Sequence, residues 1–249
     1  MFIMTHLKPA ILLSVLVLAA CGGGGGGGHH DNDSTPPQTT TPTQPDNGTT
    51  PAPEQPQSPP ESKATLGSVS GVTYTTPDGN EYQMRRDGIT FGGTWTESLV
   101  KADDTKVSST SWCCGPMSYT LFGSWTSQEK GEHGVFYSGE GTAAANVPTQ
   151  GSATYVGSGM RDGVRTDASF NVDFAAKTIN GNITGNDDFG SAVAMQGNIV
   201  DGGFNGNAQS GGENGTFVGH FNGPAAEELG GIAEFADTSK SASFGATKQ

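Results

Sequence analysis

The chain has 249 residues, including 39 glycines, and its 25 acidic residues outnumber 12 Lys and Arg to give a net charge of -13. This acidity argues against a nucleic-acid partner, because neutralising phosphates requires clustered Lys and Arg. Glycine is unfavourable in helix interiors, so its abundance argues against a helix-rich fold. The composition therefore favours an all-β protein.

The first residues are typical of an export signal. Lys8 supplies a positive charge, and an apolar run follows from Ala10 to Leu18. The run has the length of a signal-peptide core and is shorter than the roughly 20 apolar residues of a transmembrane helix. It ends in Leu18-Ala19-Ala20-Cys21, which resembles the lipobox of bacterial lipoproteins.

The lipobox resemblance implies a signal peptide of residues 1–20 that is cleaved before Cys21. In that family the cysteine sulfur carries a diacylglyceride and the new N-terminus is acylated, and several acyl chains hold a protein on a membrane essentially permanently. Gly22 follows the cysteine, where aspartate would favour retention in the inner membrane. We therefore expect Cys21 to bind outer-membrane lipid, with the protein facing the cell exterior.

Residues 21–63 are predicted to form a disordered tether behind the lipidated cysteine. Gly22–Gly28 is an unbroken glycine run, and the following residues are rich in Pro, Thr, Gln and Ser. No aromatic residue, Leu, Ile or Val occurs between Cys21 and Leu66, so nothing offsets the entropy of ordering this segment. His29 and His30 have no further ligands at suitable spacing, so no metal site is expected.

Residues 64–131 are predicted to form a small β domain. The turn signal Thr76–Asn80 contains Pro77 and Gly79 and separates two strand-like segments, so it predicts a hairpin. A region of this size is marginal on its own and is expected to pack on its neighbour. The strand-like segments are Val72–Tyr74, Tyr82–Met84, Ile89–Phe91, Thr94–Thr96 and Tyr119–Thr126.

The segment Ser111–Met117 is predicted to be a loop and contains the adjacent cysteines Cys113 and Cys114. With Cys21 acylated, these are the remaining thiols, and export exposes them to an oxidising compartment. Adjacent Cα atoms are about 3.8 Å apart, which is shorter than usual for a disulfide. Three interpretations stay open: a strained vicinal disulfide, two buried small apolar side chains, or exposed sulfurs used in binding.

Residues 132–249 alternate apolar with polar or small residues over short segments separated by turn clusters, which predicts strands. About eight antiparallel strands point to a closed up-and-down barrel without exposed sheet edges. We expect Phe170, Val172, Phe174, Phe217 and Phe221 to fill its interior. The expected strands include Ala153–Val156, Ala168–Phe174, Thr178–Ile183, Ala192–Met195, Gly203–Gly206, Thr216–Phe221 and Gly231–Phe235.

Three motifs in this region go beyond alternation. Residues 215–231 read GTFVGHFNGPAAEELGG, residues 147–157 read VPTQGSATYVG after Gly141-Thr142, and residues 243–248 read SFGATK. Together they resemble the β-barrel of the transferrin-binding protein B superfamily. That superfamily includes transferrin- and lactoferrin-binding lipoproteins, factor H-binding protein, a heparin-binding surface antigen and hemophilin-type haem carriers.

The resemblance implies an eight-stranded C-terminal barrel paired with a handle-like β domain, a place that residues 64–131 would fill. Transferrin binders carry two such lobes, whereas this chain has room for one, which argues against intact recognition of iron-loaded transferrin. Family members are commonly exported by an outer-membrane translocator, the surface lipoprotein assembly modulator, and the resemblance further implies a TonB-dependent receptor as a partner. Binding determinants in the family lie in handle loops.

These observations predict a non-enzymatic surface module that binds a host protein or a nutrient-carrying protein. No nucleophile–base set, metalloprotease motif or phosphate-binding loop is visible in the sequence. Glu227 and Glu228 are expected to accept hydrogen bonds from loop amides. Large apolar side chains of the handle region are the candidate ligand contacts, and the alternative is that they form the core of the small domain: Trp95, Trp112, Met117, Tyr119 and Trp125.

The alternative function is haem binding of the hemophilin type. Haem needs an axial His, Met, Tyr or Cys beside an apolar slot. His220 alternates with Phe217 and Phe221, so we expect it on the outer wall of the barrel. Tyr119, Met117 and Cys113 are further conceivable ligands, but no ligation motif surrounds them, and no cofactor is therefore assigned.

Overall fold

The computed structural model describes residues 61–77, 79, 81–83, 93–100, 106–113, 117–127 and 130–249; in 93–100 and 106–113 it describes strand pairing alone. The predicted signal peptide, Cys21, nearly all of the tether and Cys114 lie outside these residues. The described residues form β-strands, with two short 3-10 turns, and the prediction of an all-β protein is confirmed. None of them belongs to a helix that is long and apolar enough to span a membrane.

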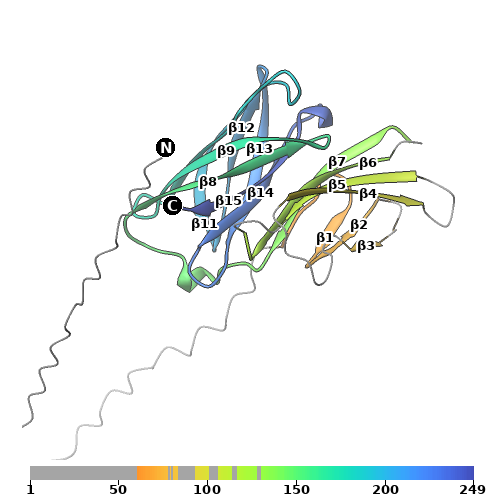
Figure 1. Cartoon of the computed structure of the whole chain (residues 1–249). Helices are drawn as coiled ribbons and strands as arrows, with labels where there is room; N and C mark the ends of the chain where they lie inside the picture. Colours follow the sequence, from red (N-terminus) through yellow and green to blue (C-terminus); the bar gives the residue numbers. More distant parts are fainter. Residues whose placement is uncertain are drawn as a thin grey trace, which may run out of the picture. The chain divides into compact units, whose positions relative to one another are not determined.

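The C-terminal part is a closed antiparallel barrel of eight strands, as predicted (Figure 1). Each strand pairs with its neighbours in sequence, and the last strand pairs with the first, which closes the sheet. The strands are β8 (Ser152–Arg161), β9 (Val164–Asp173), β10 (Thr178–Ile183), β11 (Val193–Val200), β12 (Gly203–Ser210), β13 (Glu213–Asn222), β14 (Glu228–Glu234) and β15 (Ala242–Lys248).

Aromatic side chains fill the barrel interior. All five residues predicted to lie there are buried in one hydrophobic cluster, and the rings of Phe221 and Phe204 meet at 5.4 Å between centroids. Glycines make room for these rings: a Cβ on Gly219 would lie 2.6 Å from the Phe204 ring, and one on Gly181 would lie 2.4 Å from Phe170. Large and small residues thus complement each other across a narrow barrel.

The barrel strands extend further than their apolar residues indicate. The segment Gly159–Gly163, whose glycines and aspartate are typical of a turn, is mostly strand, because β8 continues to Arg161 and the turn is Asp162-Gly163. Both turn residues have positive φ, 46° and 81°, as in a tight two-residue hairpin.

Two smaller sheets precede the barrel and are called the handle from here on. In the first, β2 and β3 pair as the predicted hairpin, and in the second the order is β4-β5-β6-β7. The strands are β1 (Ser68–Ser70), β2 (Thr73–Thr75), β3 (Glu81–Gln83), β4 (Gly93–Val100), β5 (Lys106–Cys113), β6 (Thr120–Ser127) and β7 (Glu132–Gly139).

The prediction of a loop from Ser111 to Met117 is wrong at its start. Ser111, Trp112 and Cys113 belong to β5, where Trp112 pairs with Thr94 on one side and with Phe122 on the other. The Cys-Cys-Gly-Pro sequence obscured this strand, because turn-forming residues follow it directly. Pairing with strands on both sides overrides that local signal.

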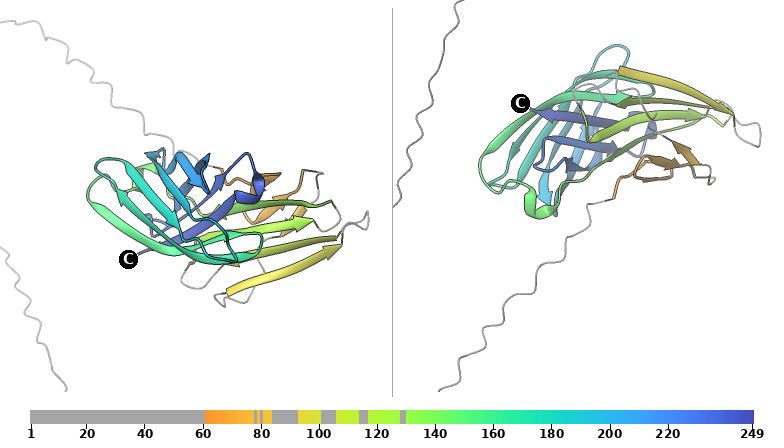
Figure 2. Two further views of the ribbon diagram at one scale, coloured as in Figure 1. Left: turned by 90° about the horizontal axis from the view of Figure 1, so that it is seen from above. Right: turned by 60° about the horizontal axis from the view of Figure 1, so that its bottom comes forward.

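Strands β6 and β7 are buried on both faces. On one face Leu121, Trp125 and Phe136 pack with Tyr74 of the three-stranded sheet. In both views of Figure 2 the orange strands β1–β3 lie along one side of the green strands. The other face packs on the outer wall of the barrel through Phe122, Val135, Tyr137, Met160 and Ile232. The handle is therefore joined to the barrel by a continuous apolar layer.

The predicted domain division at residues 131/132 falls between β6 and β7. Strand β7 pairs along its whole length with β6, so the sheet of the handle ends at Gly139. A connection that includes the 3-10 turn Ala144–Asn146 then leads to β8, where the barrel begins. The position of the domain boundary stays a prediction.

Candidate functional site

A buried carboxylate connects the barrel to the segment that enters β6. Glu228, at the start of β14, is 3% exposed and accepts hydrogen bonds from the backbone N–H groups of Ser118 at 2.5 Å and Tyr119 at 3.0 Å. Glu227 accepts one from the backbone N–H of Ala225 at 2.8 Å. The expected role of these two glutamates as acceptors of loop amides is confirmed.

Backbone hydrogen bonds extend this connection across three segments. The Glu140 N–H donates to the Tyr119 carbonyl at 2.9 Å, and the Gly223 N–H donates to the Glu140 carbonyl at 2.8 Å. The Thr142 hydroxyl donates to the Gly223 carbonyl at 2.6 Å. Gly223 has a φ of +87°, and a Cβ there would lie 2.8 Å from the Tyr119 ring. Both facts favour glycine at this position.

Asn222 forms the centre of the junction between handle and barrel. Its side chain is fully buried and donates to the Thr120 hydroxyl at 2.9 Å. A Cβ on Gly139 would lie 2.5 Å from the Asn222 amide, and one on Gly230 would lie 2.7 Å from Thr120. The 215–231 motif therefore builds the junction as well as the barrel wall, which the sequence alone did not indicate.

His220 lies on the outer wall of the barrel, as its alternation predicts, but it is covered by the handle. It is 1% exposed, and its ring faces Tyr137 of β7 at 5.0 Å between centroids. Burial lowers the pKa of His220 to about 4, so the imidazole is neutral at physiological pH. Burial, with a smaller contribution from Glu234, raises the pKa of Tyr137 above its usual value.

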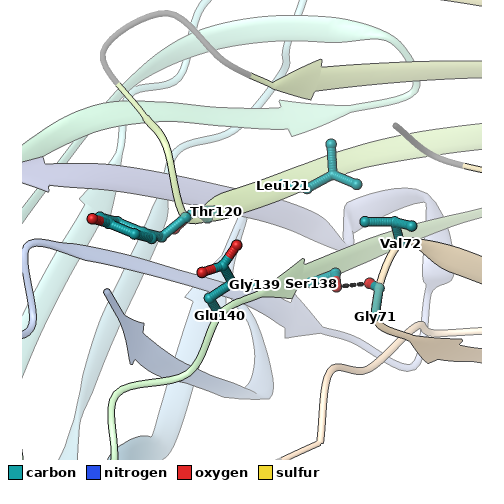
Figure 3. A pocket seen from close by; sticks show the side chains of 8 residues that line it. Gly71, Val72, Thr120, Leu121, Ser138, Gly139 and Glu140 are labelled. Atoms are coloured by element: carbon teal, nitrogen blue, oxygen red, sulfur yellow. Dashed lines mark hydrogen bonds between the residues drawn. The ribbon is translucent and has the colours of Figure 1, made fainter. Parts of the chain in front are cut away.

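A pocket of about 90 Å³ opens beside this junction. Its walls come from the β1–β2 turn, from residues 119–121 and from residues 138–140, and Figure 3 shows how they converge. The Ser138 hydroxyl donates to the Gly71 carbonyl and so ties the turn to β7. The lining residues are Gly71, Val72, Tyr119, Thr120, Leu121, Ser138, Gly139 and Glu140. Local sequence carries no signal for this set, because it is assembled from three distant segments.

The predicted contact residues fall in different places. Met117 and Trp125 are buried at 4% and 2% exposure, whereas Tyr119 is half-buried and lines the pocket. Trp95 lies in β4 and Trp112 in β5. Their role as ligand contacts stays a prediction, and so do the states of Cys113, at the end of β5, and of Cys114.

The pocket at the junction does not fit haem. The pocket is much smaller than the roughly 300–1,000 Å³ of typical cofactor sites. His220 is sealed against Tyr137, and Met117 is buried against the backbone of Gly245. His133 is engaged by the Thr238 hydroxyl at 3.1 Å. Among the described residues, no three His, Cys, Asp or Glu side chains are grouped so as to hold a metal ion.

Comparison with known proteins agrees with this architecture. Residues 131–248 match the family of C-lobe and N-lobe β-barrels of Tf-binding protein B. The barrel residues of this chain therefore match the barrel model of transferrin-binding protein B, in agreement with the resemblance noted in the sequence. No curated protein matches the sequence.

Solved structures with the same fold include two kinds of binding protein. Intact Ap-TbpB is 21% identical with a TM-score of 0.54, and 72% of this chain covers 42% of it. The apo haemoglobin receptor HpuA from Kingella denitrificans is 21% identical with a TM-score of 0.57, and the match covers 71% of this chain and 76% of HpuA. Isotype 1 TbpB from serogroup B Neisseria meningitidis is 25% identical with a TM-score of 0.52, and the match covers 74% of this chain and 40% of that TbpB. The chain thus spans about two fifths of the TbpB structures and three quarters of HpuA.

Proposed function

We propose that this protein is a surface lipoprotein whose handle and barrel form a non-enzymatic binding module for a host protein or a nutrient-carrying protein. The observation that carries the proposal is the combination of a handle with a transferrin-binding protein B-like barrel. Proteins of this fold include TbpB, and HpuA has been solved in complex with human haemoglobin. Nutrient capture and immune evasion are both served by such a module.

The filled barrel supports binding at the outer surface. Phe170, Phe217 and Phe221 occupy its interior, so a ligand has no room there, and the barrel acts as a rigid support for the handle. The pocket at the handle–barrel junction joins the candidate contact Tyr119 to residues of β7. Concave sites with apolar walls and a few polar groups are the usual places where proteins bind ligands.

The rest of the proposal concerns how the module is displayed. A lipid on Cys21 holds the protein in the outer membrane, the segment up to residue 63 gives it reach, and the module faces the cell exterior. Export depends on a surface lipoprotein translocator, and a TonB-dependent receptor takes up the captured nutrient. The lipobox and the glycine- and proline-rich sequence behind it support this part.

Capture tests the binding function directly. The chain from Gly22 to Gln249, immobilised through a C-terminal tag, is exposed to human haemoglobin, to transferrin and to host plasma, beside an unrelated acidic protein as control. We expect one protein to be retained by the chain and not by the control. Failure to retain any protein from these sources would overturn the proposal. A Soret band in the eluate without any captured protein would instead favour haem.

Display is tested separately in cells. Metabolic labelling with palmitate should label the native chain and leave a Cys21→Ser variant unlabelled. External protease should degrade the native protein on intact cells. An unlabelled chain, or one that is cleaved by protease after cell lysis alone, would contradict the proposed anchoring or its outward orientation.

A further inference from the structure

The pocket at the handle–barrel junction is apolar inside and acidic at its rim. Val72, Leu121 and Tyr119 contribute apolar surface, while Glu140 is exposed at the edge (Figure 3). The Glu140 carboxylate makes no hydrogen bond or ion pair with the part of the chain that the structure describes. A second carboxylate is close, because a Cβ on Gly223 would lie 2.5 Å from Glu227 Oε2 and 2.8 Å from the Tyr119 ring.

The size of the pocket restricts what can enter it. Its volume of about 90 Å³ is smaller than the roughly 150 Å³ of an apolar cavity that admits benzene. A single aliphatic side chain is therefore the largest group that it accommodates without rearrangement. An organic cofactor or a nucleotide would leave most of its surface outside.

Charge restricts what surrounds that side chain. At the rim, the Glu140 carboxylate has no ion-pair partner among the described residues, and the whole chain carries a net charge of -13. A cationic residue beside the anchoring side chain is therefore attracted by this carboxylate and by the overall negative field. Arginine matches this rim better than lysine, because its guanidinium can pair with a carboxylate and stack on an aromatic ring such as that of Tyr119.

The pocket is preformed by the junction. Glu228 fixes the backbone at Ser118 and Tyr119, and the Glu140 N–H donates to the Tyr119 carbonyl. On the opposite wall, the Ser138 hydroxyl holds the carbonyl of Gly71. Because these segments are already fixed, a partner does not have to order them on binding, which favours affinity.

From these observations we infer that the pocket is the anchor site for a protein partner, and that it receives a leucine-sized side chain whose neighbouring residue is arginine. The inference rests on the proposed binding function and adds the chemistry of the partner. The aliphatic side chain fills the space between Val72 and Leu121, and the guanidinium pairs with Glu140 beside Tyr119.

Short peptides test the anchor site without a known partner. The ¹⁵N-labelled chain from Gly22 to Gln249 is titrated with acetyl-Gly-Leu-Arg-Gly-amide (the Leu-Arg peptide), and amide shifts are followed by NMR. Two matched peptides serve as controls: one has Glu in place of Arg (the Leu-Glu peptide), and the other has Ser in place of Leu (the Ser-Arg peptide). We expect the Leu-Arg peptide to shift the amides of Val72, Tyr119 and Gly139. The Ser-Arg peptide should bind about tenfold or more weakly, because its side chain buries little apolar surface.

A matched pair of variants tests the charge. Glu140→Gln should weaken binding of the Leu-Arg peptide about two- to fivefold, as expected for an exposed ion pair, and should not weaken binding of the Leu-Glu peptide, because it removes a like charge. Glu132→Gln, which changes an exposed carboxylate at the start of β7, the strand that ends just before Glu140, should change the binding of neither peptide. The inference would be overturned if the Leu-Arg and Leu-Glu peptides bound equally well, or if the amide shifts lay away from the pocket. It would also be overturned if Glu140→Gln bound the Leu-Arg peptide as tightly as the native chain does. If the same amides shifted when the protein alone was concentrated without peptide, the pocket would bind a second copy of the chain, and the inference would be overturned.

The two proposals fail in different ways. If the chain captures a host protein and Glu140→Gln captures it equally well, the anchor site is wrong and the binding function stands. If the Leu-Arg peptide binds as expected and no host protein is retained, the anchor site is supported and the proposed binding of a host protein is wrong.

Discussion

The barrel and the handle are both β structure, but they use their strands differently. In the barrel one face of each strand points into a filled interior, so alternation in the sequence reports directly on the fold. In the handle, β6 and β7 are covered by Tyr74 and its neighbours on one face and by the barrel on the other. The handle thus depends on contacts that are distant in sequence, and its pocket is a product of those contacts.

The largest expected effect is in the barrel interior. Phe221 is fully buried, and its ring contacts those of Phe204 and Phe174 at 5.4 and 5.7 Å. Phe221→Ala should lower the free energy of unfolding by about 3–5 kcal/mol, because it leaves a cavity that a closed barrel cannot collapse. Urea denaturation measures this. The exposed Val200 provides the control, and Val200→Ala should change stability by about 0.5 kcal/mol or less; similar losses in both variants would contradict a filled interior.

The interface between the two regions should depend on pH through His220. Its pKa is lowered to about 4 in the folded protein, against about 6.5 in an unfolded chain. Between these values the unfolded state binds more protons, so stability is complete above about pH 6.5 and falls as the pH drops towards 4. The total loss is about 3 kcal/mol.

Unfolding by urea between pH 4 and 7 measures the contribution of His220. His220→Phe keeps an aromatic ring against Tyr137 and removes the titrating group, so its stability should depend less steeply on pH in this range. An identical slope in the two proteins would show that His220 does not titrate in the way its burial implies.

A smaller effect is expected from the carboxylate that ties the handle to the barrel. Glu228→Gln replaces one of the two acceptor oxygens with an NH2 group, so one charge-assisted hydrogen bond to a backbone N–H is lost and the other is weakened. The substitution should cost about 1.5–3 kcal/mol of stability. Amide hydrogen exchange at Ser118 and Tyr119 should accelerate more than exchange in the barrel. The neighbouring Glu227→Gln removes one carboxylate that accepts from an exposed turn, and it should cost less; the reverse order would disprove a special role for Glu228.

The sequence predicted the two regions unequally, for a physical reason. In β9 and β13, alternation placed Phe170, Phe217 and Phe221 in the interior and His220 outside, and the structure confirms each position. The cover over His220 was not predictable, because it comes from β7, more than 80 residues earlier in the chain. The pocket lining likewise unites three segments through pairing that no local pattern reports.

The smallest expected effect comes from an ion pair at the surface between the segment before the handle strands and the barrel. Lys63, in the segment that leads into β1, pairs with Glu234 of β14, and their side chains are 50% and 23% exposed. Lys63→Met should lower stability by about 0–1 kcal/mol. Because about 1 M salt reduces the Debye length to roughly 3 Å, the difference from the native protein should disappear there. The Glu228→Gln difference should persist in the same salt, since the Glu228 side chain itself is 3% exposed. If salt abolished both differences, the handle would be held to the barrel by screened surface charge rather than by the buried junction around Asn222 and Glu228.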